Sequence, residues 1–335
     1  MSTVEPSVEQ PQSMAVDPGA HVLPPSPSDV TTPNATHNGM VSGSATTSPF
    51  QIDDTSARAG RPTIAGDRIT VWNVPFDRLD MWQSVDRIDA LIRRGIPSYA
   101  ITANLNYCML HNRDPQVRRV TREAALILAD GQPIVWRSKL SNRKLPERVA
   151  GRELLVHLCG RAAQRGYRVY LLGGQPGVAD RAATMLCQLH PGLQVAGTES
   201  PPYRELTATE HQEQLERIRV SGADVLFVAF GQPKGEKWIC ENHQALGVPM
   251  SIQLGASFDF LAGTAKQAPD WVGRCGLEWA YRMAADPRRL VPRYTSNAAF
   301  LAGALVEDWR KQVTEWGMGD WAPIANPASQ RRPNR

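Results

Sequence analysis

Residues 224–229, DVLFVA, form a continuous apolar run that leads directly into residues 230–238, FGQPKGEKW. A short apolar run of this kind is typical of a strand that is buried on both faces of a sheet. Gly231 and Pro233, which follow it, are typical of a turn and of the first turn of a helix. The stretch therefore predicts a strand, a turn and a helix, an arrangement with which α/β domains present a ligand-binding edge. The new helix N-terminus favours anionic groups.

The same alternation of apolar runs and helical segments extends along the chain from residue 98. Strands are predicted at residues 98–104, 125–129, 167–172, 194–197, 224–230 and 249–254, and helices near residues 114–123, 151–165, 177–189 and 207–220. This alternation is the signature of a parallel sheet covered by helices on both faces. The predicted fold class is therefore α/β, with a Rossmann-like parallel sheet.

Composition divides the 335 residues into segments. Residues 1–65 contain no lysine, are rich in Ser, Thr, Pro, Asn and Gly, and show almost no periodic apolar pattern. They cannot bury enough surface to offset the entropy of ordering, so they are predicted to be disordered. They also lack the basic start and apolar centre of a secretory signal. The α/β domain is predicted over residues 66–270, an Arg- and Trp-rich region over 271–318, and a second disordered tail over 319–335.

Several features argue against other classes of protein. The five cysteines form no CxxC pair, which indicates reduced thiols in a cytosolic protein. No apolar stretch reaches 18 residues, so no transmembrane helix is predicted. The seven histidines form no pair at metal-ligand spacing, and HExxH is absent, so neither a metal site nor a cofactor is predicted.

The net charge of +4 is concentrated at the C-terminal end. Residues 282–335 carry eight Arg and one Lys against five acids, and five of the nine Trp lie after residue 270. A basic segment with Trp fits a membrane surface, an anionic ligand or a nucleic acid. Its aromatic residues and arginines are not arranged as in a nucleic-acid-binding module, so no nucleic-acid partner is predicted.

Polar residues and glycines follow the predicted strands, and in parallel sheets ligands bind at the carboxyl ends of the strands. The residues at these ends are Thr102, Asn104, Asp130, Gly173, Gly174, Gly231, Gln232, Gly255 and Asp259. A carboxylate in such a place is a candidate general base, although Asp130 and the following glycine also suit an ordinary turn. Thr102 and Asn104 share one strand face and suit a sugar or a phosphate, or a helix cap.

Two further motifs have alternative interpretations. The glycine-rich turn at residues 173–177 lets a ligand approach the backbone, but it is neither GxGxxG nor a Walker loop and also suits a plain strand-to-helix turn. The arginines at 282, 288, 289 and 293 stand among aromatic residues. They suit either a clamp for a diphosphate or a solvated face.

These motifs, in this order, resemble those of the WecG/TagA/CpsF glycosyltransferase family (glycosyltransferase family 26). The resemblance is carried by ITAN at 101–104, ADG at 129–131, RVAG at 148–151, LLGGQPG at 171–177, GQPKGE at 231–236, GASFDFLAG at 255–263, AP at 268–269 and EWAYR at 278–282. They cover about residues 70–300. The resemblance implies an inverting, metal-independent transfer of a sugar from a UDP-sugar to a polyprenyl-diphosphate-linked saccharide. The products of the family are cell-surface polysaccharides, including exopolysaccharide.

The resemblance also implies roles for single residues. Asp130 matches the family's proposed catalytic base, and Thr102 and Asn104 match polar residues of its pocket. The predicted substrate-binding residues are Thr102, Asn104, Gly173, Gly174, Gln232, Lys234, Glu236, Asp259, Arg282, Arg289 and Arg293. The last three fall in a helical C-terminal appendage whose arginines are thought to hold diphosphate.

The implied location is cytoplasmic, with the protein peripheral on the inner face of the cell membrane. Residues 300–306, FLAGALV, are too short to span a bilayer. They fit either a helix in the membrane interface or one packed on the domain. A homo-oligomer is left open, and so is the donor sugar, for which N-acetylmannosamine, its uronic acid and glucose all occur among similar proteins.

Three positions depart from the family pattern. Gly235 stands where Gln is usual, Gln267 where Arg is usual, and Pro292 where a second Arg is usual. These departures leave open a relative that binds UDP-sugar and has lost catalysis. A nicotinamide-dependent oxidoreductase on the same sheet is a further alternative, against which stands the lack of GxGxxG after the first strand.

Overall fold

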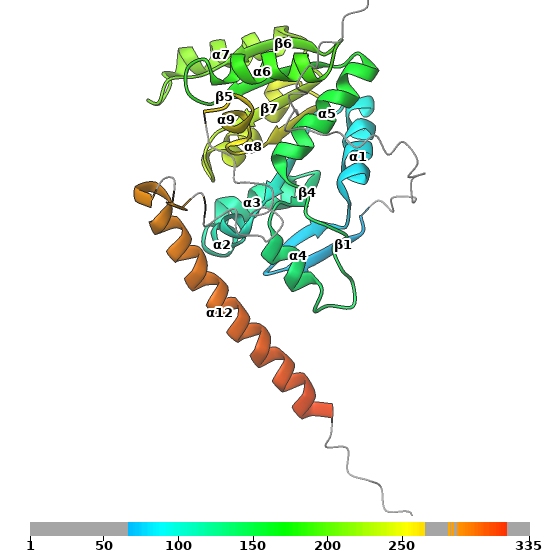
Figure 1. The fold of residues 1–335 in the computed structure, drawn as a ribbon, viewed down its shortest axis with the longest axis vertical. Helices are drawn as coiled ribbons and strands as arrows, with labels where there is room; N and C mark the ends of the chain where they lie inside the picture. Colours follow the sequence, from blue (N-terminus) through cyan, green and yellow to red (C-terminus); the bar gives the residue numbers. More distant parts are fainter. Residues whose placement is uncertain (1–65, 265–280, 282, 285–286, 320–335) are drawn as a thin grey trace, which may run out of the picture. The chain divides into compact units, whose positions relative to one another are not determined.

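The structure, a computed structural model, describes residues 66–264, 281, 283–284 and 287–319, with the backbone alone for residues 289 and 311–319. Its centre is a six-stranded sheet in the order β4-β3-β8-β7-β5-β6, in which all neighbours are parallel (Figure 1). The strands are β3 (Ser98–Ala103), β4 (Leu126–Ala129), β5 (Arg168–Gly173), β6 (Gln194–Glu199), β7 (Val225–Ala229) and β8 (Met250–Gln253). The predicted α/β, Rossmann-like fold is confirmed.

Helices cover the sheet in two groups. One group contains α1 (Met81–Arg94), α5 (Gly151–Arg165), α6 (Val178–Leu189) and the short α9 (Ser257–Leu261), which contact one another and the sheet. The other contains α2 (Leu105–Arg113), α3 (Pro115–Glu123), α7 (Ala208–Val220) and α8 (Lys234–Leu246). Both layers bury apolar side chains of the strands, which explains why β4 and β7 read as continuous apolar runs.

A hairpin that the sequence reading missed closes one edge of the sheet. It consists of β1 (Arg68–Val71) and β2 (Val74–Asp77), paired antiparallel and packed beside β4. Its two turn residues, Trp72 and Asn73, both have positive φ angles, of 48° and 67°. A tryptophan there gives none of the usual Asn-Gly signal for such a turn, which is why the pattern was not recognised. Asp77 links the hairpin to β4 by accepting a 2.8 Å hydrogen bond from the Ile127 amide.

Two more helices complete the described chain. The short α4 (Gln132–Ser138) follows β4, and the long α12 (Pro287–Gly319) lies in the predicted appendage. Two contacts hold α12 against the domain: the Phe300 ring meets Trp72 edge-on at 6.1 Å between ring centroids, and Asp308 pairs with Arg137. Within the described residues, no helix is both long enough and apolar enough to cross a membrane.

Some predicted features lie outside the described residues. These are the disordered segment at residues 1–65, all but the first residue of the tail at 319–335, and the departure at Gln267. The departure at Pro292 lies inside α12, which continues through it.

Candidate active site

A cavity of about 1520 Å³ runs along the carboxyl ends of the strands. It is larger than the roughly 300–1,000 Å³ of ordinary small-ligand pockets. Residues from the loops after all six strands line it, including Asn104 after β3, Asp130 after β4 and Gln232 after β7.

Most of the predicted site residues meet in this cavity. Its lining includes Thr102, Asn104, Asp130, Gly174, Gln232, Lys234, Asp259 and Arg293. Gly173 and Glu236 are buried beside it and do not line it. Arg282 lies outside the described residues, and of Arg289 only the backbone is described, as part of α12.

Thr102 and Asn104 have different local roles. The Thr102 hydroxyl is buried and donates a 2.9 Å hydrogen bond to the carbonyl of Gln253 on the neighbouring strand. Asn104 is the N-cap of α2, and its Oδ1 accepts from the Tyr107 amide at 3.1 Å. Its side-chain nitrogen has no hydrogen bond within the described residues. Asn104 can therefore cap α2 through its side-chain oxygen while its side-chain nitrogen remains available to a ligand in the cavity.

Asp130 stands where β4 ends and α4 begins. Its backbone amide donates to the carbonyl of Ala103 at 2.9 Å, which fixes it beside β3. The next residue, Gly131, lies so close to the start of α2 that an added Cβ would be 3.6 Å from the Cα of Asn104. The close approach of these two loops brings Asp130 and Asn104 to the same wall of the cavity.

Gln232 connects three elements at the cavity floor. Its Oε1 accepts hydrogen bonds from Asn106 Nδ2 and from Arg293 Nη2, each at 3.1 Å. Asn106 lies in the first turn of α2 and Arg293 near the start of α12, so Gln232 links the sheet domain to the appendage. Sequence reasoning missed Asn106 because only the tertiary contact with Gln232, 126 residues away, distinguishes it from other polar helix residues.

Glu236 is the most unusual ionisable group near the cavity. It is fully buried, and neither carboxyl oxygen has a hydrogen-bond partner within the described residues. Burial raises the pKa of Glu236 to about 7, although its own backbone amide, the Gln232 side chain and the charge of Arg293 partly oppose the shift. The carboxyl group therefore exchanges its proton near neutral pH.

Gly235, one of the three departures, has a steric explanation in this chain. The amide of Gln253 fills the space where a side chain at position 235 would begin, and an added Cβ would collide with it. The Gln253 Nε2 donates in turn to the carbonyl of Phe230 at 2.5 Å. The Gln253 side chain therefore fits in this position only because residue 235 is a glycine.

Two arginines that were not predicted as site residues also line the cavity. Arg148 and Arg152 flank Gly151, the first residue of α5. The Arg152 guanidinium lies 5.5 Å from the ring centroid of Phe260. A helix N-terminus with flanking arginines favours anions such as phosphate. The RVAG motif at 148–151, with an arginine just before a helix start, could have indicated this anion-binding position from sequence.

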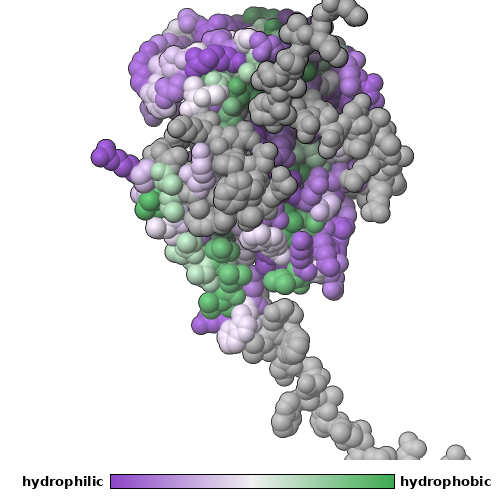
Figure 2. All heavy atoms as spheres, viewed as in Figure 1, coloured by the Kyte–Doolittle hydropathy of each residue, from purple (hydrophilic) through white to green (hydrophobic). Residues whose placement is uncertain are grey.

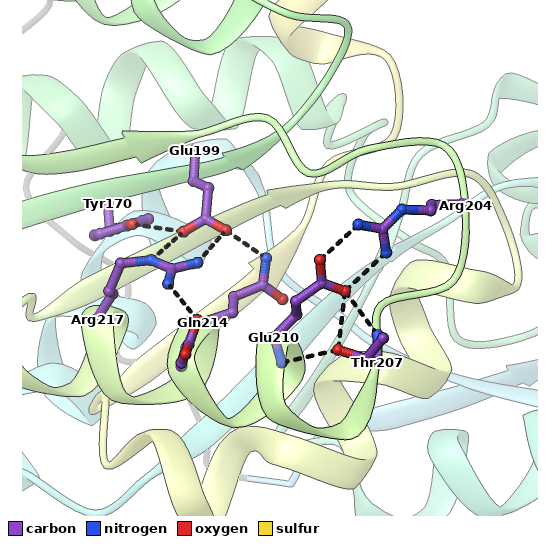
Figure 3. Close-up of polar contacts among 8 residues, drawn as sticks. Tyr170, Glu199, Arg204, Thr207, Glu210, Gln214 and Arg217 are labelled. Atoms are coloured by element: carbon purple, nitrogen blue, oxygen red, sulfur yellow. Dashed lines mark hydrogen bonds and ion pairs between the residues drawn. The ribbon is translucent and has the colours of Figure 1, made fainter. Parts of the chain in front are cut away.

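The loop between β6 and α7 forms the opposite wall, and two polar clusters hold it (Figure 3). Glu199 accepts from Gln214 at 2.7 Å and from Arg217 at 3.1 Å. Arg204 donates to Glu210 at 2.7 Å, and this contact together with the backbone of Thr207 lowers the pKa of Glu210 to about 2. The Arg204–Glu210 pair therefore stays charged at neutral pH, and both clusters tie the loop to α7.

Tyr203 lies in this loop and lines the cavity, and its side chain is otherwise exposed. Its hydroxyl accepts a 2.7 Å hydrogen bond from Gln175, in the glycine-rich turn after β5. The two turns therefore present an aromatic ring and backbone amides at one end of the cavity. No group of three His, Cys, Asp or Glu within the described residues is arranged to hold a metal ion.

The sequence pattern described as "Glycosyl transferase WecG/TagA/CpsF family" matches residues 69–314. The chain belongs to this family and is a glycosyltransferase. This excludes the oxidoreductase alternative.

Relatives of the chain carry the name N-acetylglucosaminyldiphosphoundecaprenol N-acetyl-beta-D-mannosaminyltransferase. The protein from Bacillus subtilis (strain 168) is 29% identical over 67% of this chain and 88% of its own length. That from Bacillus spizizenii is 30% identical over 59% of this chain and 77% of its own length. That from Staphylococcus aureus (strain NCTC 8325) is 28% identical over 67% and 87%.

Proposed function

We propose that this chain is an inverting glycosyltransferase that moves a hexose-type sugar from a UDP-sugar to a polyprenyl-diphosphate-linked saccharide during cell-surface polysaccharide synthesis. The names of its relatives support a sugar acceptor linked through diphosphate to a polyprenol and a donor sugar of the N-acetylmannosamine class. The observation that carries the proposal is the large cavity that gathers Asp130, Asn104 and Gln232 at one sheet edge.

In the proposed reaction Asp130 is the general base. Its carboxylate accepts the proton of an acceptor hydroxyl while that oxygen attacks the anomeric carbon of the donor sugar. The new C–O bond forms on the face opposite the bond to the diphosphate, which breaks, so the anomeric configuration inverts. UDP leaves with the bonding electron pair. Neutral Asp130 afterwards returns its proton to solvent.

The charge on the departing diphosphate needs compensation. Arg148, Arg152 and Arg293 line the cavity, and the first turn of α5 directs backbone N–H groups to the same edge. Cationic groups and helix N-termini placed where charge develops lower the barrier for such a step. We therefore propose that the leaving diphosphate lies beside these groups, between the nucleotide and the acceptor.

The substrates are assigned to opposite ends of the cavity. Tyr203 and the glycine-rich turn offer a flat aromatic ring and an open backbone, which suit a nucleotide base and its phosphates. The acceptor then lies towards Asp130 and α12.

Membrane association through α12 is part of the proposal. Figure 2 shows hydrophobic side chains gathered along this helix, and Leu305, Val306 and Trp309 are among its exposed residues. Phe300 packs on the domain, so the opposite side of the helix is available to lipid. We assign the protein to the inner face of the cell membrane as a peripheral protein, where a lipid-linked acceptor is held.

UDP release by the full chain tests the function. A panel of UDP-sugars is offered with and without a short-chain prenyl-diphosphate-sugar, with EDTA added in parallel. Release that depends on acceptor and survives EDTA is the expected result and identifies the donor. UDP binding without release from any donor would overturn the proposal in favour of a relative that has lost catalysis.

A further inference from the structure

The segment from Trp136 to Lys144, with the sequence WRSKLSNRK, has an unusual surface composition. It contains four cationic residues and no acidic one. The segment also exposes two large apolar side chains to solvent: Trp136 is 52% exposed and Leu140 is 66% exposed. Exposed large apolar groups interleaved with cations suit a surface that is apolar just below and anionic at its boundary.

Ion pairs within the protein account for only part of this charge. Arg137 donates to Asp308 on α12 at 2.7 Å, and Arg143 pairs with Asp67. Lys139 and Lys144 are exposed and form no ion pair with any described residue. Two cations beside the exposed leucine are therefore available to an external anion.

The Arg137–Asp308 pair places this segment beside the middle of α12 (Figure 1). Trp136 and Leu301 line the same cavity, one from each element. Leu305 and Trp309 follow Leu301 at intervals of four residues, so they continue the same face of the helix. Trp136 and Leu301 thus meet at the cavity, and the exposed apolar residues of each element lie further along the chain from them.

We propose that the Trp136–Lys144 segment is a second lipid-contact surface, in which Trp136 and Leu140 enter the boundary between headgroups and acyl chains while Lys139 and Lys144 bind anionic headgroups. The α/β domain itself, and not α12 alone, then faces the bilayer. The proposal rests on the proposed membrane association but is independent of which sugar is transferred.

The combination of positive charge and exposed apolar side chains favours a bilayer over other occupants. A second copy of the chain docked through the same segment would place cations against cations. A nucleic acid offers phosphates but no apolar layer for Leu140. An anionic bilayer satisfies both kinds of side chain, and tryptophan is enriched at such interfaces. Binding there would fix the cavity with its acceptor end towards the membrane, where a lipid-linked sugar is presented.

The test is co-flotation of the full chain with vesicles of phosphatidylcholine containing about 30% phosphatidylglycerol, a moderately anionic surface. Two variants change the segment: Lys139→Glu with Lys144→Glu, and Leu140→Glu. Arg94→Glu with Arg122→Glu is the control for charge, because both arginines are exposed and form no ion pair with any described residue. Val220→Glu, at 66% exposure on α7, is the control for Leu140→Glu.

We expect the double lysine variant to partition about thirty-fold less, from the usual contribution of two cations near an anionic surface. Leu140→Glu is expected to lose about ten-fold, because a charge replaces an apolar side chain that the proposal buries in the bilayer. Both controls should stay within about two-fold of the parent protein, since exposed residues elsewhere contribute little. UDP release with a water-soluble acceptor should be unchanged in all four, which shows that the fold is retained.

Equal partition of the segment variants and their controls would overturn the proposal. Loss of RNA binding or of self-association in these variants, with vesicle binding intact, would overturn it as well and assign the surface to that partner. Failure of the proposed function appears differently, as absent UDP release from the parent protein, and leaves the flotation result interpretable.

Discussion

Replacing Glu236 by glutamine should change how stability depends on pH. The carboxyl group has a pKa of about 7 in the folded chain against an ordinary value of 4.5, because it is buried. A raised pKa favours folding while the group is protonated. This contribution is complete below about pH 4.5 and is lost as pH rises to about 7. Because the glutamine amide does not ionise in this pH range, the stability of the variant should not fall in this way as pH rises.

The magnitude follows from the two pKa values. A shift of one unit corresponds to about 1.4 kcal/mol, so the carboxyl group costs the folded state roughly 3 kcal/mol above pH 7 relative to its neutral form. Between pH 5 and pH 8 the difference in unfolding free energy between variant and parent should change by roughly 2 to 3 kcal/mol, in favour of the variant at pH 8. Any constant cost of the buried amide cancels in this comparison.

Urea unfolding of both proteins at pH 5 and pH 8 measures the difference. Glu241→Gln is the matched control, because Glu241 lies on the same helix and is exposed. Its substitution should leave the pH dependence unchanged. If Glu236→Gln shifts stability equally at both pH values, the carboxyl group does not titrate as the burial argument requires.

Three further results are expected. Gly235→Ala should lower the free energy of unfolding by about 1–3 kcal/mol, because its Cβ collides with Gln253, and adding Gln253→Ala to this variant should restore most of that loss. If urea titration shows no such rescue, the steric account is wrong. Asn106→Ala should lower kcat/KM about five- to ten-fold in UDP-release kinetics, since Gln232 loses one of its two donors; an unchanged value would remove this positioning role. Tyr203→Ala should raise KM for the donor about ten-fold and leave KM for the acceptor unaltered, and the reverse pattern would exchange the two ends of the cavity.

The sheet and the edge that carries the site could be predicted from sequence because both depend on local pattern. The apolar run at residues 225–229 and the turn after it needed no knowledge of distant contacts. The same holds for Asp130, which a strand and a glycine place at the edge. Element boundaries agreed to within two residues for most strands.

What the sequence did not predict depends on contacts between distant segments. Gly235 looked like a damaged motif until the structure placed Gln253, from another strand, in its space. Glu236 was predicted to bind substrate, and only the structure shows that it is fully buried beside the cavity and does not line it. Trp72 and Asn73 form a hairpin turn without the expected residues, because the contacts of β2 with β4 stabilise it.

The measurement that tests the central claim most directly is the turnover of Asp130→Asn. UDP release is followed with the donor and short-chain acceptor that the parent protein uses, and thermal unfolding confirms that the variant is folded. As the general base, Asp130 should be needed for the chemical step, so kcat should fall about a hundredfold or more while KM for the donor changes little. Turnover close to that of the parent protein would contradict the account of this cavity as a base-assisted glycosyltransferase site.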